Sequence, residues 1–383
     1  MTRDSRAKVV ALATSAILLL AACGGGASSP ASTTAPATEA PASQPAASTP
    51  AESQPAESTG TGTIEPLEDA VTVRIGVFPN ITHAPGLVAL ADDGLLKQLL
   101  PNADIQVSQF STGTLASEAL LTDSIDLTYI GPNPAINAYV KTNGNVRVIS
   151  GSTSGGAFLV VRDGINAPAD LAGKSIASPS LGNTQDVALR KWLANQGFET
   201  DTAGGGDVNI VPQENSQTLE TFLAGTIDGA WVPEPWATRL IQDAGAHVLV
   251  DERDLWPDGE YVTTHLLVNK PYLDANPEVI KRILAANVQA VDFVNDNQAE
   301  AQTIVNSEIE KLTTKPLGED LLKTAWSNLH YTVDPIASSL QKSADDAVAV
   351  GLLEDPGDLS GLYDLTLLNE VLSSLSQEEV SGL

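Results

Sequence analysis

The sequence has few cysteines and few basic residues. Cys23 is the only cysteine among 383 residues, which excludes an internal disulfide and a cysteine-based metal cluster. Lys and Arg number 20 against 48 Asp and Glu, and the formal net charge is −28. The chain contains no basic patch, so nucleic acids and anionic lipid surfaces are poor partners. An anionic ligand would have to be bound by backbone N–H groups at helix N-termini.

The N-terminus has the features of a targeting signal. Basic residues between Arg3 and Lys8 precede an apolar run, Val9 to Leu20, which is too short to span a membrane. The sequence before Cys23 resembles a bacterial lipobox, so residues 1–22 are predicted to be a lipoprotein signal peptide. Cys23 would then carry the lipid and tether the chain to the outer face of the cell membrane without spanning it. The alternative is a plain secretory signal with a chance cysteine.

Residues 24–68 contain almost no large apolar side chain and consist mainly of Ala, Ser, Thr, Pro, Gly and Glu. Such a composition cannot bury enough surface to offset the entropy of folding. We therefore expect residues 23–68 to form a disordered stalk that begins with the lipidated cysteine, with a reach on the order of 35–40 Å.

The remainder of the chain, about 315 residues, exceeds the usual size of a single core, so two lobes are expected. From Val71 onward, short β-branched runs alternate with helical stretches, which predicts an α/β fold with parallel-rich sheets. One helix is expected over 82–100, with Asp92 to Gly94 as a candidate break. Beyond Pro271 the sequence is mostly helical, and we expect the tail to fray from about Ser373.

Two corners of the sequence are similar to each other. The segment from Ile125-Asp126 to Gly131-Pro132 ends the third strand of the first half, and the segment from Ile227-Asp228 to Pro233-Glu234 ends the third strand of the second half. We interpret them as equivalent positions of two related lobes.

Four segments carry family motifs in order. They are Gly76 to Asn80 with Thr82 to Ala84, Leu115 to Ala138 (LASEALLTDSIDLTYIGPNPAINA), Asp170 to Ala177 with Gly182 to Thr184, and Ile227 to Ala237 (IDGAWVPEPWA). Through them, residues 71 to about 350 resemble the periplasmic-type substrate-binding proteins of the nitrate/sulfonate/taurine ABC importer family. One departure is Ser124, where the family usually has glycine.

The resemblance implies a type II-like periplasmic-binding-protein fold of class α/β, with two parallel-rich mixed sheets joined by two crossovers. Lobe I would contain 71–155 with 263–383, and lobe II would contain 156–262. Hinges would lie near Gly155-Gly156 and Tyr261-Val262, and the lobes would close on a ligand. The implied role is capture of a small anionic or zwitterionic ligand and its delivery to the permease subunits of an ABC importer. No cofactor or metal is expected, and a monomer is the default.

Ligands of open α/β sheets bind beyond the carboxyl ends of the strands, which selects the loops after the predicted strands. One such loop, Ser111, Thr112, Gly113 and Thr114, precedes a helix. Gly182, Asn183 and Thr184 form the matching loop of the other lobe. Hydroxyl and N–H groups in both loops could bind an oxyanion. Both loops also have the composition of helix N-caps, and the two roles are compatible.

Four further candidates have an equally ordinary structural interpretation. Asn133 lies between two prolines and could contact a ligand or form a turn. Asn80 and His83 follow the first strand, although a lone histidine is more often structural. Trp236 could pack on the ligand's alkyl or amine part, but a large aromatic residue is more often in the core.

Glu234 bears on the kind of ligand. A carboxylate at the mouth of an anion site repels an anion unless the ligand also carries a cationic group. If Glu234 faces the ligand, an aminosulfonate of the taurine type is favoured over nitrate or a simple alkanesulfonate. The alternative is that Glu234 points away and braces the Pro-Glu-Pro turn.

The sequence favours three functional classes to different degrees. Uptake is favoured, with taurine or an alkanesulfonate as ligand and nitrate, bicarbonate or a pyrimidine thiamine precursor as alternatives. An enzyme is disfavoured, because the chain has one cysteine, four scattered histidines and no nucleophile, phosphate-loop or metal-ligand motif. A ligand-sensing surface lipoprotein built on the same lobes stays open.

Overall fold

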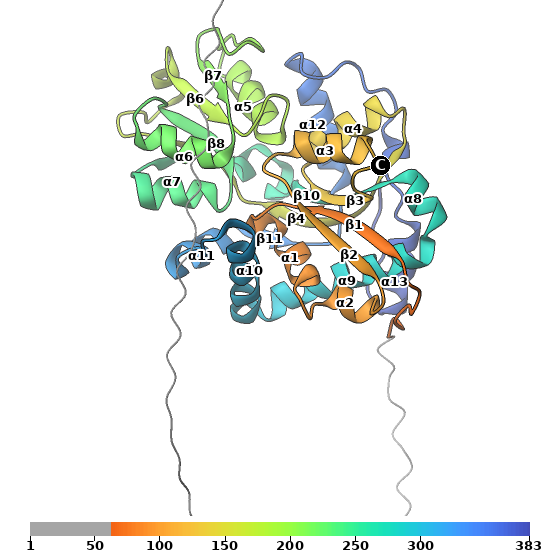
Figure 1. The fold of residues 1–383 in the computed structure, drawn as a ribbon. Coiled ribbons are helices and arrows are strands. Elements are labelled where there is room, and N and C mark those ends of the chain that lie inside the picture. Colours follow the sequence, from red (N-terminus) through yellow and green to blue (C-terminus); the bar gives the residue numbers. More distant parts are fainter. Residues whose placement is uncertain (1–62) are drawn as a thin grey trace, which may run out of the picture. The chain divides into compact units, whose positions relative to one another are not determined.

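The computed structural model describes residues 63–383 (Figure 1). The predicted signal peptide, Cys23 and most of the predicted stalk lie outside the described residues. The last residues assigned to the stalk contact the fold: Leu67 N donates to Leu99 O over 2.9 Å, and Ile64 and Leu67 pack against the core. The folded part therefore begins earlier than predicted, because Ile64 and Leu67 bury apolar side chains and the backbone of Glu65 and Glu68 accepts hydrogen bonds from Arg282 and Asn102.

The first sheet has six strands in the order β11-β4-β10-β3-β1-β2. Strand β1 pairs in parallel with β2 and β3, whereas β10 pairs antiparallel with β3 and β4, and β11 with β4. The strands are β1 (Thr72–Val77), β2 (Asp104–Gln109), β3 (Leu127–Ile130), β4 (Val146–Gly155), β10 (Val262–Asn269) and β11 (Leu329–Tyr331).

The second sheet has five strands in the order β7-β6-β8-β5-β9. Strand β6 pairs in parallel with β7 and β8, and β5 pairs antiparallel with β8 and β9. Both sheets are mixed, as predicted, but the expected excess of parallel pairs is absent among the described strands because the strands near the crossovers pair antiparallel. The strands are β5 (Ala157–Val161), β6 (Ser175–Ser178), β7 (Asn209–Pro212), β8 (Gly229–Pro233) and β9 (His247–Asp251).

Helices cover both faces of each sheet, because successive strand side chains point to opposite faces. On β5, Phe158 and Val160 belong to a core with α6 and α7, while Leu159 and Val161 belong to a core with α5 (Figure 1). The six-stranded sheet packs one face against α1, α2, α9, α10, α11 and α13, and the other against α3, α4 and α12. Within residues 63–383, no apolar core draws side chains from both sheets.

The helices have the following bounds: α1 (Ala84–Leu90), α2 (Leu95–Leu99), α3 (Gly113–Leu121), α4 (Pro132–Lys141), α5 (Thr184–Asn195), α6 (Asn215–Leu223), α7 (Trp236–Ala244), α8 (Lys270–Ala275), α9 (Pro277–Asp296), α10 (Gln298–Thr313), α11 (Glu319–Trp326), α12 (Ala337–Ala349) and α13 (Thr366–Ser374). Short 3-10 helices are η1 (Ile81–His83), η2 (Pro168–Leu171), η3 (Glu252–Leu255), η4 (Pro257–Gly259) and η5 (Ser360–Leu362). None of the helices among these residues is long and apolar enough to cross a bilayer.

The helix predicted over 82–100 and the C-terminal tail can now be compared with the structure. The helix expected over 82–100 is interrupted at the candidate break, where Gly94 N donates to Ala91 O over 2.7 Å before α2 begins. The tail was expected to fray from about Ser373. This expectation is wrong for the residues up to Val380. Asn369 holds Val380 through two hydrogen bonds of 3.0 Å between its side-chain amide and the Val380 backbone.

We propose the lobe boundaries that the resemblance implies, and we use lobe I for the residues around the six-stranded sheet and lobe II for those around the five-stranded sheet. The first crossover runs from β4 to β5 through Gly155 and Gly156, whose φ angles are +77° and +73°. This left-handed conformation favours glycine. The second crossover enters β10 at Tyr261, whose hydroxyl group accepts a hydrogen bond from Ala157 N over 3.1 Å. The two crossovers are thus joined.

The two similar corners of the sequence have the same backbone contacts. Asp126 N donates to Arg74 O while Arg74 N donates to the Asp126 carboxylate over 2.8 Å. In lobe II, Asp228 N donates to Ser175 O and Ser175 N donates to the Asp228 carboxylate over 2.9 Å. This shared pattern supports the interpretation that the two corners are equivalent positions of the two lobes.

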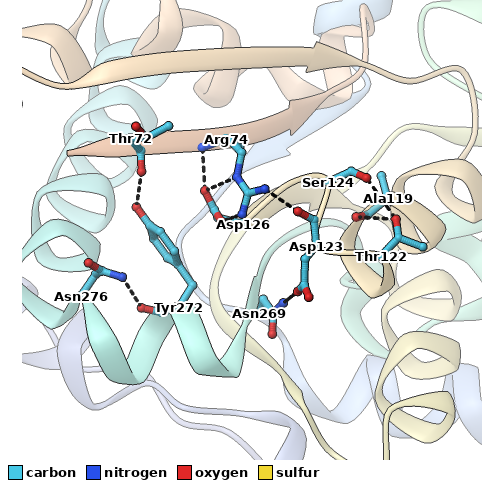
Figure 2. A network of polar contacts seen from close by, with 10 residues as sticks. All are labelled: Thr72, Arg74, Ala119, Thr122, Asp123, Ser124, Asp126, Asn269, Tyr272 and Asn276. Carbon is cyan, nitrogen blue, oxygen red and sulfur yellow. Dashed lines mark hydrogen bonds and ion pairs between the residues drawn. The ribbon is translucent and has the colours of Figure 1, made fainter.

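The lobe I corner carries an additional ion pair. Figure 2 shows the Arg74 guanidinium group against the Asp126 carboxylate, with a further contact to the backbone oxygen of Asp123. Both residues lie near the amino ends of β1 and β3, at the opposite end of the sheet from the loops that were predicted to bind ligand. We assign this network to the stability of lobe I.

We expect Asp126→Asn to lower the free energy of unfolding by about 1–2 kcal/mol, because asparagine removes the negative charge and places an NH₂ group where Asp126 Oδ1 accepts from Arg74 Nη2. Asp228→Asn should cost less, because Asp228 faces only Lys174 at 3.8 Å, with both side chains partly exposed. Urea unfolding of the two variants measures the difference. Equal losses would show that the backbone contacts, and not the arginine, stabilise the corner.

Candidate ligand-binding site

A small cavity of about 40 Å³ lies where the carboxyl ends of strands from both lobes meet. Among the described residues, no Lys, Arg, Asp or Glu side chain lines this cavity, although the chain as a whole is strongly acidic. Its lining is Phe78, Asn80, Thr82, His83, Ser111, Thr112, Gly131, Pro179, Asn183, Thr184, Gln185, Asn215, Pro233, Thr263 and Thr264. We refer to it as the inner cavity.

Four helices begin at the inner cavity. Thr112 is the N-cap of α3, Gly131 precedes α4, Thr184 begins α5 and Asn215 begins α6. Two of these N-termini come from lobe I and two from lobe II. Free N–H groups and the positive end of the helix dipole favour an anion at such N-termini, and α4 offers fewer N–H groups than the others because it begins with Pro132 and Pro134. The cavity can therefore bind negative charge without a basic side chain.

Two buried polar atoms of the lining have no hydrogen-bond partner among the described residues. They are Thr184 Oγ1 and Asn215 Oδ1, both from lobe II. Burying an unpaired polar group costs about 1–3 kcal/mol, so native proteins rarely leave one unused. An oxyanion in the inner cavity can accept from the Thr184 hydroxyl group and, with the side-chain amide turned over, from Asn215 Nδ2.

His83 contributes a neutral ring to the inner cavity. Burial lowers the pKa of His83 to about 3, so its imidazole group is uncharged at neutral pH. Phe78 N donates to Nδ1 over 3.4 Å, which places the ring proton on Nε2. The ring stacks on Phe78 with centroids 4.5 Å apart. His83 is thus available as a fixed hydrogen-bond donor rather than as a positive charge.

Side-chain contacts between the lobes surround the inner cavity. Ser111 Oγ donates to Glu214 Oε1 over 2.8 Å, and Trp236 Nε1 donates to Asn80 Oδ1 over 3.1 Å. Thr114 Oγ1 lies 3.3 Å from Ser180 Oγ. Each pair joins a residue of lobe I to a residue of lobe II, so the lobes are in contact around the cavity in this conformation.

A larger cavity of about 780 Å³ adjoins the inner cavity and shares Phe78, Asn80, Ser111 and Asn215 with it. We refer to it as the outer cavity. Part of its lining is apolar and includes Phe110, Pro235, Trp236, Pro316, Leu317 and Leu321. Charged side chains, among them Glu214, Arg239 and Lys315, line other parts. The outer cavity has room and apolar surface for the organic part of a ligand.

The structure brings most of the predicted binding residues together. Asn80, His83, Ser111, Thr112, Asn183 and Thr184 line the inner cavity, and Trp236 lines the outer cavity. Thr114 and Gly113 lie beside the cavity at the contact between the lobes. A Cβ atom on Gly113 would clash first with Pro134 of lobe I and would also lie 3.2 Å from Asn183 Oδ1 of lobe II, so glycine permits both approaches.

Asn133 and Gly182 are not part of this lining. Asn133 is in the first turn of α4 rather than in a loop, and its Nδ2 donates to Ser343 O over 3.1 Å, which fixes α4 against α12. It faces a separate cavity of about 160 Å³. Gly182 has a φ of +73° and donates its N–H to Asp186, so it forms the turn before α5.

The Glu234 carboxylate faces Thr238 and Asn328 rather than either cavity, in keeping with the alternative considered for it. Thr238 donates to both of its carboxylate oxygens, over 3.1 Å from N and 2.8 Å from Oγ1, and Asn328 Nδ2 donates over 2.7 Å. Burial raises the pKa of Glu234 above its ordinary value. The carboxylate braces the start of α7 against lobe I and lines neither cavity, so it gives no argument for a ligand amine.

Several lining residues were missed from the sequence. Asn215 begins α6 just after β7, and the rule about the carboxyl ends of strands would have selected it had it been applied to that strand. Thr82 and Gln185 directly adjoin predicted residues in helices. Thr263 and Thr264 lie near the start of β10, which directly follows the second crossover.

The fold has two mixed α/β sheets, and two adjoining cavities lie where the carboxyl ends of their strands meet. A model of the NMT1-like family matches residues 67–307, more than half of the chain, so the chain belongs to the NMT1-like family of substrate-binding proteins. This is a family of binding proteins, so the prediction that the chain is not an enzyme is confirmed.

Relatives and solved structures agree with this assignment. A binding protein of Brucella abortus is 26% identical over 309 residues, which cover 78% of this chain and 91% of that protein. The taurine-binding periplasmic protein of Escherichia coli is 27% identical over 222 residues, which cover 58% of this chain and 66% of that protein. The alkanesulfonate-binding protein of Xanthomonas axonopodis superposes with a TM-score of 0.64 at 21% identity, covering 76% of this chain and 96% of that chain. The nitrate-binding protein of Synechocystis superposes with a TM-score of 0.65 at 17% identity, covering 80% and 89%. The predicted fold class is confirmed.

Proposed function

We propose that this protein is the extracytoplasmic substrate-binding component of an ABC importer, anchored by a lipid on Cys23, and that it binds a small organic oxyanion of the sulfonate class. The anionic head would lie in the inner cavity and the organic part in the outer cavity. The observation that carries the proposal is the convergence of four helix N-termini on a cavity without a charged lining residue.

The size of the inner cavity supports a head group rather than a whole organic ligand. A cavity needs a volume of roughly 10–15 Å³ to hold one water molecule, so the inner cavity, at about 40 Å³, suits a group of a few heavy atoms. An oxyanion fits because Thr112, Asn183 and His83 supply hydroxyl, amide and ring donors there.

Within this class, an alkanesulfonate is favoured over taurine. The earlier argument for an aminosulfonate required a carboxylate facing the ligand amine, and Glu234 is occupied by Thr238 and Asn328. Inorganic nitrate or bicarbonate would leave the apolar wall around Phe110 and Trp236 without a ligand contact. The relatives and solved structures are named for taurine, aliphatic sulfonates and nitrate, so they support a small oxyanion and the cavity supports the choice within that class.

Calorimetry on the chain from residue 24 tests the proposal with propane-1-sulfonate, taurine and nitrate. We expect propane-1-sulfonate to bind most tightly and Asn215→Ala to weaken its binding about 10-fold, because the variant removes a cavity-lining amide group. The matched control is Asn209→Ala, since Asn209 lies in lobe II, lines neither cavity and donates its side-chain amide to Ser175 Oγ. Tighter binding of nitrate than of propane-1-sulfonate, or equal effects of the two variants, would contradict the proposal.

A further inference from the structure

A buried ion pair lies directly behind the inner cavity in lobe II. Arg190 Nε is 3.0 Å from Asp186 Oδ2, one turn apart on α5, and their side chains are 1% and 0% exposed. Neither residue lines the inner or the outer cavity. Removing two charges from water is expensive, and a buried pair of this kind often adds little net stability over apolar residues. Stability alone therefore does not explain why this pair is buried here.

Asp186 holds both ends of the loop that carries the lobe II binding groups. Ser178 Oγ, at the end of β6, donates to Asp186 Oδ1 over 2.6 Å. Gly182 N, in the turn before α5, donates to Asp186 Oδ2 over 2.9 Å. The intervening loop, 179–184, includes Pro179, Asn183 and Thr184 of the inner cavity. One carboxylate thus fixes the loop from its strand end to its helix end.

The same carboxylate creates an electrostatic problem. Asp186 lies in the first turn of α5, beside the N-terminus that we assign to the ligand anion. Two negative charges at one helix N-terminus compete for the same dipole and repel each other strongly in a medium of low dielectric constant. Arg190, one turn further along α5, neutralises the Asp186 carboxylate. Its guanidinium group also donates to the backbone oxygen of Asp201.

We propose that Asp186 and Arg190 are positioning residues for ligand binding: Asp186 fixes the 179–184 loop, and Arg190 cancels the negative charge that this fixation places behind the anion site. The neutralising role of Arg190 rests on the proposed function, whereas the fixing role of Asp186 does not depend on which ligand binds.

The neutralising role is tested by the affinity for propane-1-sulfonate in three variants. Arg190→Met leaves Asp186 unpaired and should weaken binding about 30-fold, whereas Arg190→Lys should weaken it about 3-fold because it keeps the charge. The double variant Asp186→Asn with Arg190→Met should bind about 10-fold more tightly than Arg190→Met alone. Because the double variant also regains the stability that an unpaired buried charge costs, the unfolding temperature of each variant is measured beside its affinity. A double variant that binds no better than Arg190→Met, well below the unfolding temperature of both, would overturn this role.

The fixing role is tested without ligand by hydrogen–deuterium exchange. Asp186→Asn should speed exchange of the amides of residues 179–184 by about 10-fold. The control, Asp228→Asn, removes a carboxylate at the opposite end of β6, where it accepts from Ser175 N, and should leave the loop unchanged. Unchanged exchange of the loop in Asp186→Asn would overturn the fixing role. If the wild type binds no sulfonate, the proposed function and with it the role of Arg190 fail, and the exchange experiment still decides the role of Asp186.

Discussion

The Gly131→Ala variant should bind its ligand about 100-fold more weakly than the wild type and unfold at the same temperature. A Cβ atom on Gly131 would lie 2.7 Å from Thr184 Oγ1, closer than side-chain atoms normally approach. Gly131 belongs to lobe I and Thr184 to lobe II, so the clash arises only where the lobes meet. The φ of Gly131 is −73°, which alanine adopts without strain. The substitution should therefore obstruct closure without disturbing lobe I, and calorimetry with thermal unfolding measures both effects.

Gly86→Ala provides the matched control for Gly131→Ala. A Cβ atom on Gly86 would lie 2.7 Å from the ring of Tyr129, which is buried within lobe I. This clash lies inside one lobe, so we expect a lower unfolding temperature with nearly unchanged affinity. A Gly131→Ala variant that lost stability to the same extent as Gly86→Ala would show that its effect is not confined to closure.

Glu252 should make the protein less stable as the pH rises from 4.5 to 7. Burial raises the pKa of Glu252 from 4.5 to about 7, although Trp231 Nε1 and Trp256 Nε1 donate to it over 2.7 Å and 3.4 Å. Between these pH values the unfolded chain has released a proton that the folded chain retains, so stability falls as the pH rises. A displacement of this size corresponds to about 3 kcal/mol, and the loss is complete above pH 7.

Replacing Glu252 by glutamine should remove this pH dependence, because glutamine keeps an acceptor for Trp231 and carries no charge at any pH. We expect Glu252→Gln to match the wild type near pH 4.5 and to be more stable by up to about 3 kcal/mol at pH 8. Urea unfolding at the two pH values measures the difference. The exposed Glu118→Gln serves as control and should follow the wild type. Parallel stability profiles of Glu252→Gln and the wild type would contradict the prediction.

The order of strands and helices could be predicted because each element carries its own local pattern. The β-branched run from Val71 and the apolar run around Val160 have the composition of buried strands, and the structure places strands there. The loops at Thr112 and Asn183 could also be found, since a polar N-cap after a strand is a local feature and the carboxyl ends of strands meet at one edge.

The direction of individual side chains could not be predicted in the same way. Glu234 and Asn133 both follow a third strand, and both turn toward partners far along the chain, Asn328 and Ser343. Nothing near either residue in the sequence indicates these partners, because they depend on how distant helices pack. The residues at the contact between the lobes were predictable in kind, as polar loop residues, but their pairing was not.

The place of β10 in the first sheet has a consequence for how the chain folds. β10 lies between β3 and β4, although it is made after the whole of the second sheet. Until residue 269 has emerged, the segment from β1 to β4 lacks its central strand and leaves two strand edges unpaired. Residues 157–251 have all the strands of their own sheet and can complete it earlier. Synthesis and export therefore expose an incomplete sheet for more than 100 residues of chain growth, the stage at which unpaired edges are most open to aggregation and to chaperones.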